Sequence, residues 1–372
     1  MKKKKIFLNI FRNFKYLIFK LLYGQIDKVI TAKKNESITI QKISFKNLIS
    51  YRLYNIPKCR LYSDTVMDTA FILNKSLIDE PSFQYRYQKN LRIINGRAKE
   101  NFVIRNGTPN FLKKINGNVF SLLTGGAGKS NYWHWLFDVL PRIGILDKSS
   151  FKNKFKYYLL PSLSKKYQIQ SLLGLKILPS RLIDGEKNKH IICNNIITVD
   201  HPINFNNNPT KSIQDIPIWI IEWLRKNYIK KNYTDLNLPK KFFISRESDS
   251  NISNRKIVNN EEIKDNLIKL GFKSLSLSDL NFKNQVELFK NANFIIGLHG
   301  AGFANMLFCR KGTKIIEIAS RDSGDVILSL AKKCKLNYKR IIGENVSTKL
   351  RFQNAHTLVN ISKLKKLILS FK

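Results

Sequence analysis

The order of apolar and polar positions divides the chain into parts with different patterns. Up to about residue 120, short β-like runs such as 37–45 and 52–56 are separated by polar turns. Beyond residue 240, strand-like runs alternate regularly with amphipathic helical segments. Such alternation over short connections predicts a parallel sheet with helices on both faces. The expected strands are 241–246, 272–277, 293–300, 313–319 and 337–343, and the expected helices are 260–271, 279–292, 301–310 and 324–336.

The middle of the chain also alternates, but less regularly. Strands are expected at 119–124, 156–160 and 191–200, and helices from residue 131 and at 164–175 and 212–231, with a polar linker at 232–240. A chain of 372 residues is long enough for two domains. We therefore predict α/β domains at 26–235 and 236–350, preceded by an amphipathic segment at 1–25. A last helix, 351–372, is expected to pack back on the N-terminal domain.

The first 25 residues combine a basic start with a regular apolar stripe. Basic residues and Asn9 lie mainly on one face of a helix, whereas Arg12, Lys15 and Lys20 interrupt any h-region of a signal peptide. The pattern predicts either an interfacial helix on anionic lipid or an amphipathic helix docked on the protein's own core. The residues that share the apolar face are Phe7, Ile10, Phe11, Phe14, Leu17, Ile18 and Leu21.

The formal net charge of +40 favours anionic partners: nucleic acid, an anionic membrane face or phosphate-bearing substrates. The chain is also rich in Lys, Asn and Ile together, so the base composition of an AT-rich genome accounts for part of the lysine. The four cysteines are far apart and form no CxxC pair. Neither a zinc site nor a disulfide framework is indicated, and a reducing compartment fits best.

The stretch TGGAGKS (124–130) ends like a phosphate-binding P-loop. A P-loop needs a glycine five residues before its Gly-Lys pair, and that position is Leu123. We therefore interpret the stretch as a loop that leads into the following helix.

The segment NYWHWLFDVLPRI (131–143) carries candidate catalytic groups. Asn131, His134 and Asp138 are spaced i, i+3 and i+7, which places them on one face of a helix, whereas Trp135 packs elsewhere. A histidine with a carboxylate one turn away is a candidate general base. The alternative is a helix start with Asn131 as its cap and His134 in a polar niche.

The segment FIIGLHGAGFANMLF (294–308) predicts a phosphate site. Ligands of open α/β sheets bind where a strand ends and the next helix begins, and small residues there let the backbone approach a phosphate. The alternative is a tight strand–helix turn with a satisfied histidine. The candidate residues are His299, Gly300, Ala301, Gly302 and Asn305.

Other strand ends of the same sheet add polar candidates. Glu317 ends the next strand and is placed for the hydroxyls of a ribose. Arg246 ends an earlier strand and is followed by Arg255, Asn259 and Glu261. Arginine forks suit a diphosphate and the charge that grows on it as it leaves.

These three segments, in this order, resemble the glycosyltransferase family 61 proteins, also described as capsular polysaccharide biosynthesis proteins. The resemblance covers roughly 120–320 and rests on NYWHWLFDVLPRI, on SRE…NRKIVNNEE, and on HGAGFAN with its downstream Glu317. It implies a GT-B architecture, two Rossmann-like domains facing a cleft. It also implies inverting transfer from a nucleotide-sugar without an essential metal or other cofactor.

Carried over residue by residue, the resemblance implies a donor site in the C-terminal domain and an acceptor side in the N-terminal one. Asp138 or His134 would be the base, and we favour Asp138 with His134 as its partner. The acceptor side would also include Asn131 and Trp133. The donor, expected to be UDP-linked, would meet Arg246, Arg255, Asn259, Glu261, His299, Gly300, Ala301, Gly302, Asn305 and Glu317.

The implied acceptor is a growing surface glycan, free or lipid-linked, made at the cytoplasmic face of the cell membrane, where residues 1–23 would hold the enzyme as a peripheral protein. Two rival functions are a nucleic-acid-binding protein, suggested by the charge, and an inactive scaffold of a polysaccharide assembly complex. The sequence lacks RNP-like strands, zinc spacing and a helix-turn-helix, which disfavours specific nucleic-acid binding.

Overall fold

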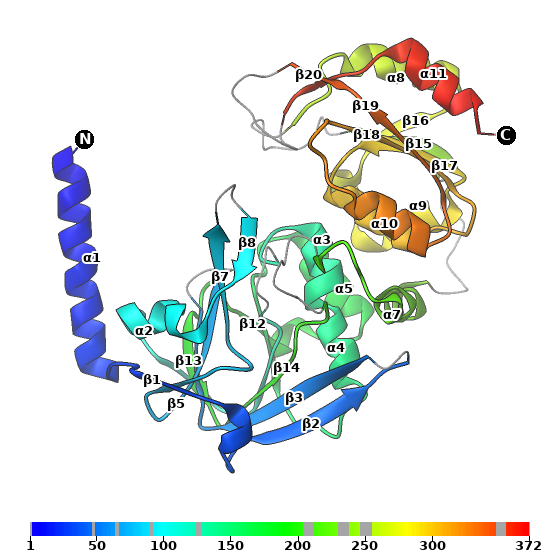
Figure 1. Cartoon of the computed structure of the whole chain (residues 1–372). Coiled ribbons are helices and arrows are strands. Elements are labelled where there is room, and N and C mark those ends of the chain that lie inside the picture. The colour runs from blue at the N-terminus through cyan, green and yellow to red at the C-terminus, as the bar shows by residue number, and fades with distance from the viewer. Residues whose placement is uncertain are drawn as a thin grey trace. The chain divides into compact units, whose positions relative to one another are not determined.

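Residue contacts divide the computed structural model into two units (Figure 1). Unit 1 comprises Met1–Lys165 and Ile177–Ile213, and unit 2 comprises Lys166–Lys176 and Gln214–Lys372. The unit boundary thus lies about twenty residues before the position expected from the polar linker, because the helix at 218–228 packs with the second unit. The described residues are 2–46, 49–63, 67–88, 92–123, 128–203, 212–229, 238–245, 255–346 and 355–371.

Unit 1 contains two mixed sheets. The eight-stranded sheet follows the order β1-β6-β5-β4-β13-β9, with β7 paired to β5 and β8 paired to β7. Its core is apolar, with Leu61, Phe71 and Ile191 buried. Its strands are β1 (Lys28–Ile30), β4 (Arg60–Ser63), β5 (Asp68–Leu73), β6 (Ser76–Ile78), β7 (Phe83–Gln88), β8 (Arg92–Asn95), β9 (Lys113–Ile115) and β13 (His190–Cys193).

The second sheet of unit 1 has the order β12-β11-β10-β14-β3-β2. The first four of these strands are parallel to one another. Strand β3 runs antiparallel to β14, and β2 runs antiparallel to β3. The chain passes from β10 to β11 and β12 on one side and later places β14 on the other side, so the strand order reverses between β10 and β14. The strands are β2 (Thr39–Ser44), β3 (Ser50–Pro57), β10 (Val119–Ser121), β11 (Tyr157–Leu160), β12 (Leu182–Asp184) and β14 (Asn195–Val199).

Helices of unit 1 include the long N-terminal helix α1 (Lys2–Tyr23) and a helical segment that follows β10. That segment consists of α3 (Tyr132–His134), a π-helical stretch (Trp135–Val139) and α4 (Pro141–Leu146). The remaining helices are η1 (Ala32–Lys34), η3 (Ala98–Glu100), α2 (Phe102–Asn106) and η5 (Pro179–Arg181). Among the described helices, none is both long and apolar enough to cross a membrane.

Unit 2 is built on one parallel sheet with the order β16-β15-β17-β18-β19. The strand order reverses between β15 and β17, which makes this sheet doubly wound. Its strands are β15 (Lys241–Ser245), β16 (Lys273–Ser276), β17 (Phe294–Leu298), β18 (Lys314–Ala319) and β19 (Asn337–Ile342), and a separate ribbon pairs β20 (Glu344–Asn345) with β21 (Thr357–Leu358).

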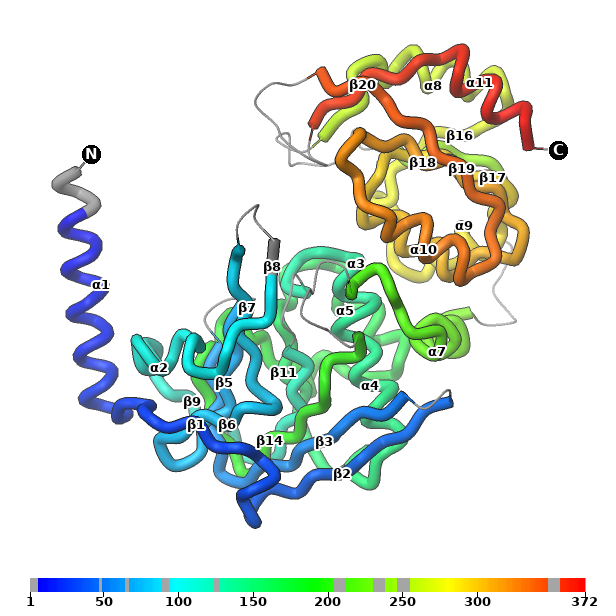
Figure 2. Tube along the Cα trace, viewed as in Figure 1, coloured from blue at the N-terminus to red at the C-terminus, as the bar shows by residue number. Residues whose placement is uncertain are grey.

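Helices cover both faces of this sheet, as the strand–helix alternation predicts (Figure 2). Alternate strand residues such as Phe243, Ile296 and Ile316 pack under α8 and α11. On the opposite face, Phe242 packs against Phe289 of α9, with ring centroids 5.4 Å apart. The helices are α5 (Lys166–Gly174), α7 (Ile218–Tyr228), α8 (Asn260–Lys269), η6 (Leu277–Asp279), α9 (Phe282–Asn291), η7 (Ala301–Phe308), α10 (Val326–Lys333) and α11 (Ile361–Leu369).

Three sequence expectations change. The run 191–200 is not one strand but parts of two, β13 and β14, which belong to different sheets. The helix expected at 301–310 is the 3₁₀ helix η7. The C-terminal helix α11, expected to pack on the N-terminal domain, buries Leu364 and Ile368 in the core of unit 2.

Gly343, between β19 and β20, leaves no room for a side chain. An added Cβ would overlap Thr357 and lie 2.7 Å from the carbonyl oxygen of Leu358 in β21. Gly343→Ala should therefore lower the free energy of unfolding by about 1–3 kcal/mol, measured by urea denaturation. Gly324→Ala is the matched control, because the nearest atom to its added Cβ is 3.8 Å away. Equal stability of the two variants would contradict this packing.

Candidate active site

The first candidate constellation lies on the helical segment after β10. Asn131 caps it: its side chain accepts a hydrogen bond from Trp133 N at 2.9 Å. Pro141 has no N–H for the carbonyl of Phe137 and would clash with it in a regular α-helix. The turn before Pro141 is a π turn, in which Leu140 N donates to Trp135 O, five residues earlier, at 3.0 Å. Such π turns are frequent at functional sites.

His134 and Asp138 form a tight pair across this turn. His134 Nδ1 lies 2.6 Å from Asp138 Oδ2, and Asp138 is fully buried. Because an ionised carboxylate can only accept, His134 Nδ1 carries the proton of this bond and Nε2 is the basic atom of the ring. The side chain of His134 is 18% exposed. The histidine of the pair, and not the carboxylate, can therefore reach a substrate.

Two residues from neighbouring elements join this pair. His201 follows β14, and its Nε2 lies 3.9 Å from Asp138 Oδ2. Arg142 of α4 is buried and donates to the carbonyl of Val199, the last residue of β14. The constellation thus lies at the carboxyl ends of β10 and β14, where the strand order reverses, which is where open α/β sheets bind ligands.

Burial determines the charges in this constellation. It lowers the pKa of His201 to about 4, although Asp138 acts to raise it, so the His201 ring is neutral near pH 7. Burial also lowers the pKa of Arg142, to about 10, which leaves the guanidinium charged. Among the described residues, Asp138 Oδ1 is buried without a hydrogen-bond partner. The negative charge of Asp138 is thus balanced by Arg142 and by any proton that His134 takes up.

The second candidate constellation lies in unit 2 around Glu317, which is fully buried in β18. In the register of the sheet, Glu317 has Gly297 on one side and Arg340 on the other. One carboxylate oxygen, Oε1, pairs with His299 Nδ1 just after β17. The other, Oε2, accepts from Tyr338 OH and from Arg340 Nε, the latter at 2.9 Å.

Arg340 is the outer partner of this network. Its Nη1 donates to Asp325 at 2.9 Å, and its Nη2 donates to the carbonyl of Gly324. Burial acts to lower the Arg340 pKa, but the charges and hydrogen bonds of Glu317 and Tyr338 together outweigh it and raise the pKa. Burial and the same carboxylate raise the pKa of Tyr338. Both oxygens of Glu317 are therefore committed to protein partners, so the carboxylate orients His299 and is not presented to a ribose.

The turn after β17 has the tight geometry that its small residues suggest. A Cβ at Gly302 would lie 2.8 Å from a methyl group of Leu277. The amides of Ala301 and Gly302, at the start of η7, have no partner within that helix. Asn305 is buried, and its Nδ2 donates to Gln285 of α9 at 3.0 Å. Asn305 thus fixes η7 to α9.

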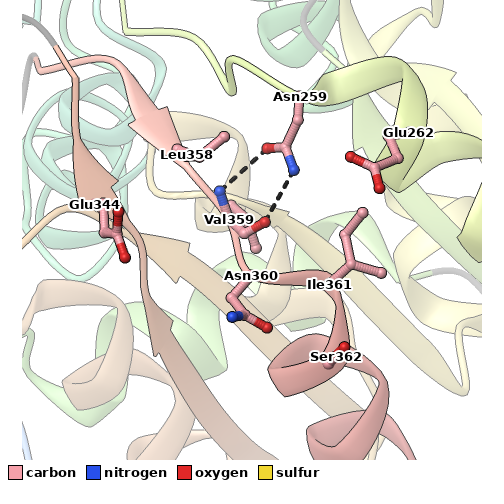
Figure 3. Close-up of a pocket in the computed structure, with 8 residues that line it drawn as sticks. All are labelled: Asn259, Glu262, Glu344, Leu358, Val359, Asn360, Ile361 and Ser362. Atoms are coloured by element: carbon pink, nitrogen blue, oxygen red, sulfur yellow. Dashed lines mark hydrogen bonds between the residues drawn. The ribbon is translucent and has the colours of Figure 1, made fainter.

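The remaining donor candidates lie around the start of α8. Arg246 is outside the described residues, whereas Arg255 lies two residues before Ile257, which pairs with Thr357. Figure 3 shows that the Asn259 side chain bonds in both directions to the backbone of Val359, at 2.9 and 3.1 Å. Glu261 is exposed and pairs with Lys264 at 3.5 Å.

Figure 3 also shows the pocket beside Asn259, which has a volume of about 320 Å³. It lies between the starts of α8 and α11 and is lined by Asn259, Glu262, Glu344, Leu358, Val359, Asn360, Ile361 and Ser362. His299 and Glu317 are not among these residues. Of the donor candidates, His299 and Glu317 contact each other. Asn259 instead bonds to the backbone of Val359, and Glu261 pairs with Lys264.

Comparison with known proteins identifies the family. The family model described as Glycosyltransferase 61 matches residues 132–316, which include the His134–Asp138 pair and the turn after β17. The chain belongs to glycosyltransferase family 61. The family resemblance expected from the three motifs is thereby confirmed. No match was found among curated proteins. Family membership supports glycosyltransferase activity and implies a sugar donor and a glycan acceptor.

In this family 61 chain, sequence reasoning missed four residues of the two constellations. Tyr338 and Arg340 stand two apart on a strand and therefore share a face with Glu317, which is a signal that alternation could have given. Arg142 interrupts an apolar run, and His201 directly follows a strand and one polar residue. His201 lies just beyond the carboxyl end of a strand, where ligands of open α/β sheets bind and where polar side chains merit notice.

The P-loop-like stretch that ends in Gly128, Lys129 and Ser130 has a structural role. Lys129, the lysine of the P-loop-like stretch, pairs with Glu186, and this hydrogen bond lowers the pKa of that carboxyl. Across the described ranges, no group of three or more His, Cys, Asp or Glu side chains is arranged to hold a metal ion.

The neutral state of buried His201 predicts a pH-dependent stability. Its folded-state pKa of about 4 lies below its ordinary value of 6.5, so the unfolded chain takes up the proton first as the pH falls. The free energy of unfolding should therefore decrease between pH 6.5 and 4, by roughly 2 kcal/mol at about pH 5. Urea denaturation at pH 7 and pH 5 should show a correspondingly smaller loss for His201→Gln. An identical loss in both proteins would mean that folding does not lower the pKa of His201.

Proposed function

We propose that this family 61 glycosyltransferase is an inverting, metal-independent enzyme. It would move a sugar from a nucleotide-sugar, expected to be UDP-linked, to a hydroxyl of a growing surface glycan such as capsule, lipopolysaccharide or exopolysaccharide. The observation that carries the proposal is the His–carboxylate pair found in each unit, each at or beside a strand-order reversal between parallel strands. The GT-B arrangement expected from the family resemblance is part of this proposal.

The proposed donor half is unit 2. A diphosphate bound outside the carboxyl ends of β15 and β17 would accept hydrogen bonds from the amides of Ala301 and Gly302 and from the His299 ring. Glu317 would hold that ring in place and stabilise its protonated form, while Tyr338 and Arg340 hold Glu317. Positive charge and backbone amides would then stabilise the leaving diphosphate, a role that a metal ion has in other transferases.

The proposed base is His134. Inverting transfer is a single displacement, so one base must remove the proton of the acceptor hydroxyl as the oxygen attacks the sugar. Asp138 was the favoured base from sequence, but its complete burial makes it the group that orients His134 and balances its acquired charge. His201 and Arg142 complete the surroundings of that carboxylate.

The donor site is tested by calorimetry of UDP, GDP, CMP and dTDP, with single-stranded DNA as the rival ligand. We expect one nucleotide diphosphate to bind selectively, and Arg255→Ala and His299→Gln to weaken it roughly tenfold or more. Arg310→Ala is the matched control, because Arg310 lies at the far end of η7 and bonds Asn291. Binding of DNA with no nucleotide bound would favour the nucleic-acid function that the charge suggests.

The base is tested by separating turnover from donor affinity. His134→Gln and Asp138→Asn should lower kcat by roughly 10²–10⁴-fold and leave the donor affinity unchanged. His299→Gln should raise the dissociation constant of the donor. The acidic limb of the pH–kcat profile should disappear in His134→Gln.

The reverse pattern, with donor affinity lost in His134→Gln and only turnover lost in His299→Gln, would exchange the two roles. Full activity of Asp138→Asn, with an unchanged pH profile, would remove the proposed pair. Unchanged activity of all three variants would favour a scaffold function.

A further inference from the structure

Helix α1 presents two opposite faces, and only one of them is packed. Its C-terminal half docks on unit 1 through Tyr16, Phe19 and Tyr23, which are spaced three and four residues apart. Tyr16 packs edge-on against Phe102 at 5.8 Å, and Phe19 packs against Phe111 at 5.1 Å. The hydroxyl of Tyr23 accepts from Leu112 N at 3.0 Å.

The apolar stripe of α1 lies on the other side. At 3.6 residues per turn its centre falls roughly 160° from the centre of the docked face. Phe7 is 70% exposed, Phe14 59% and Leu21 79%. The stripe, including the neighbouring Ile6 and Leu22, consists of Ile6, Phe7, Ile10, Phe11, Phe14, Leu17, Ile18, Leu21 and Leu22, all classed as exposed large hydrophobic residues. The alternative that the stripe packs on the protein's own core is therefore wrong for this helix.

The positive charge of α1 favours an anionic surface as the partner of the stripe. The helix carries seven basic residues and no acidic one. Lys15 is exposed and borders the stripe, whereas Arg12 is exposed on the side of the docked face. The long side chain of Lys15 can therefore reach outward to headgroups while the aromatic rings enter the apolar layer. An apolar face bordered by cations is complementary to an anionic lipid surface.

We propose that α1 is an interfacial membrane anchor that lies in the plane of an anionic bilayer. The stripe enters the boundary between headgroups and acyl chains, and the docked face holds unit 1 on the opposite side of the helix. Tyr23 ties the end of the helix to the fold, because its carbonyl also accepts from Arg60 Nη1 at 3.1 Å. The anchor is therefore joined directly to unit 1 and not through a flexible linker.

This inference does not depend on the transferase reaction. It provides a peripheral site of action at a membrane, where a lipid-linked glycan would be available as an acceptor. Membrane binding and donor binding are measured separately, so either can fail without the other.

The test is flotation of the full chain with vesicles of phosphatidylcholine alone and of phosphatidylcholine mixed with phosphatidylglycerol. We expect binding only to the mixed vesicles, weakened by salt. The variant Phe7→Ser/Phe11→Ser/Phe14→Ser should lose at least about 100-fold in affinity, because three apolar side chains no longer leave water. Lys15→Gln should lose about fivefold.

Two variants control for folding of the helix. Phe7→Leu/Phe11→Leu/Phe14→Leu keeps the apolar character and should retain most of the binding, and Asn9→Ser/Asn13→Ser changes positions outside the stripe and should bind like the wild type. All variants should keep the wild-type thermal unfolding midpoint. Unchanged binding of the serine variant, or equal binding to both vesicles, would overturn the proposal. So would a wild-type chain that self-associates through the stripe and does not float, because a second copy would then be the occupant.

Discussion

A fully buried carboxylate must be paired, and in unit 2 that requirement ties three adjacent strands together. Glu317 in β18 contacts His299 at the end of β17 and both Tyr338 and Arg340 in β19. Removing any partner would leave part of a buried charge uncompensated, which is strongly destabilising. Gly297, in register with Glu317, carries no side chain, so β17 places no side chain beside the carboxylate on that face. The hydrogen bond to Glu317 therefore fixes the position of the His299 ring.

Unit 1 also contains a fully buried carboxylate, Asp138, that is paired with a histidine. Asp138 is buried on a helix, and it holds the ring of His134 through one oxygen. The π turn before Pro141 carries this pair, while His201 follows β14 and Arg142 lies in α4. In each unit a buried acid fixes a histidine that is more exposed than itself. This pairing makes both histidines candidates for proton transfer or anion binding, and their different exposures motivate the different roles that we propose.

Much of unit 2 was predictable from the sequence, because parallel strands and amphipathic helices have different periods. The five strands and the helices between them were expected close to their observed bounds, as was the position of His299 after a strand. The contacts of Glu317 were not predictable, because Tyr338 and Arg340 lie more than twenty residues away and only the register of β18 and β19 brings them together. The run 191–200 is interrupted at Asn194 and Asn195, where β13 ends and β14 begins, but the sequence does not show that the two halves pair in different sheets. Similarly, helical spacing placed Asp138 beside His134 but could not show that Asp138 is buried and that His134 is the accessible member of the pair.

Hydrogen–deuterium exchange of the full chain, with and without the nucleotide diphosphate, tests the central claim most directly. The ligand should slow exchange in a peptide covering 299–305, where the amides of Ala301 and Gly302 begin η7, and should leave exchange in β20 and β21 unchanged. Slower exchange around His134 and His201, with none at 299–305, would contradict it and would assign the phosphate site to unit 1.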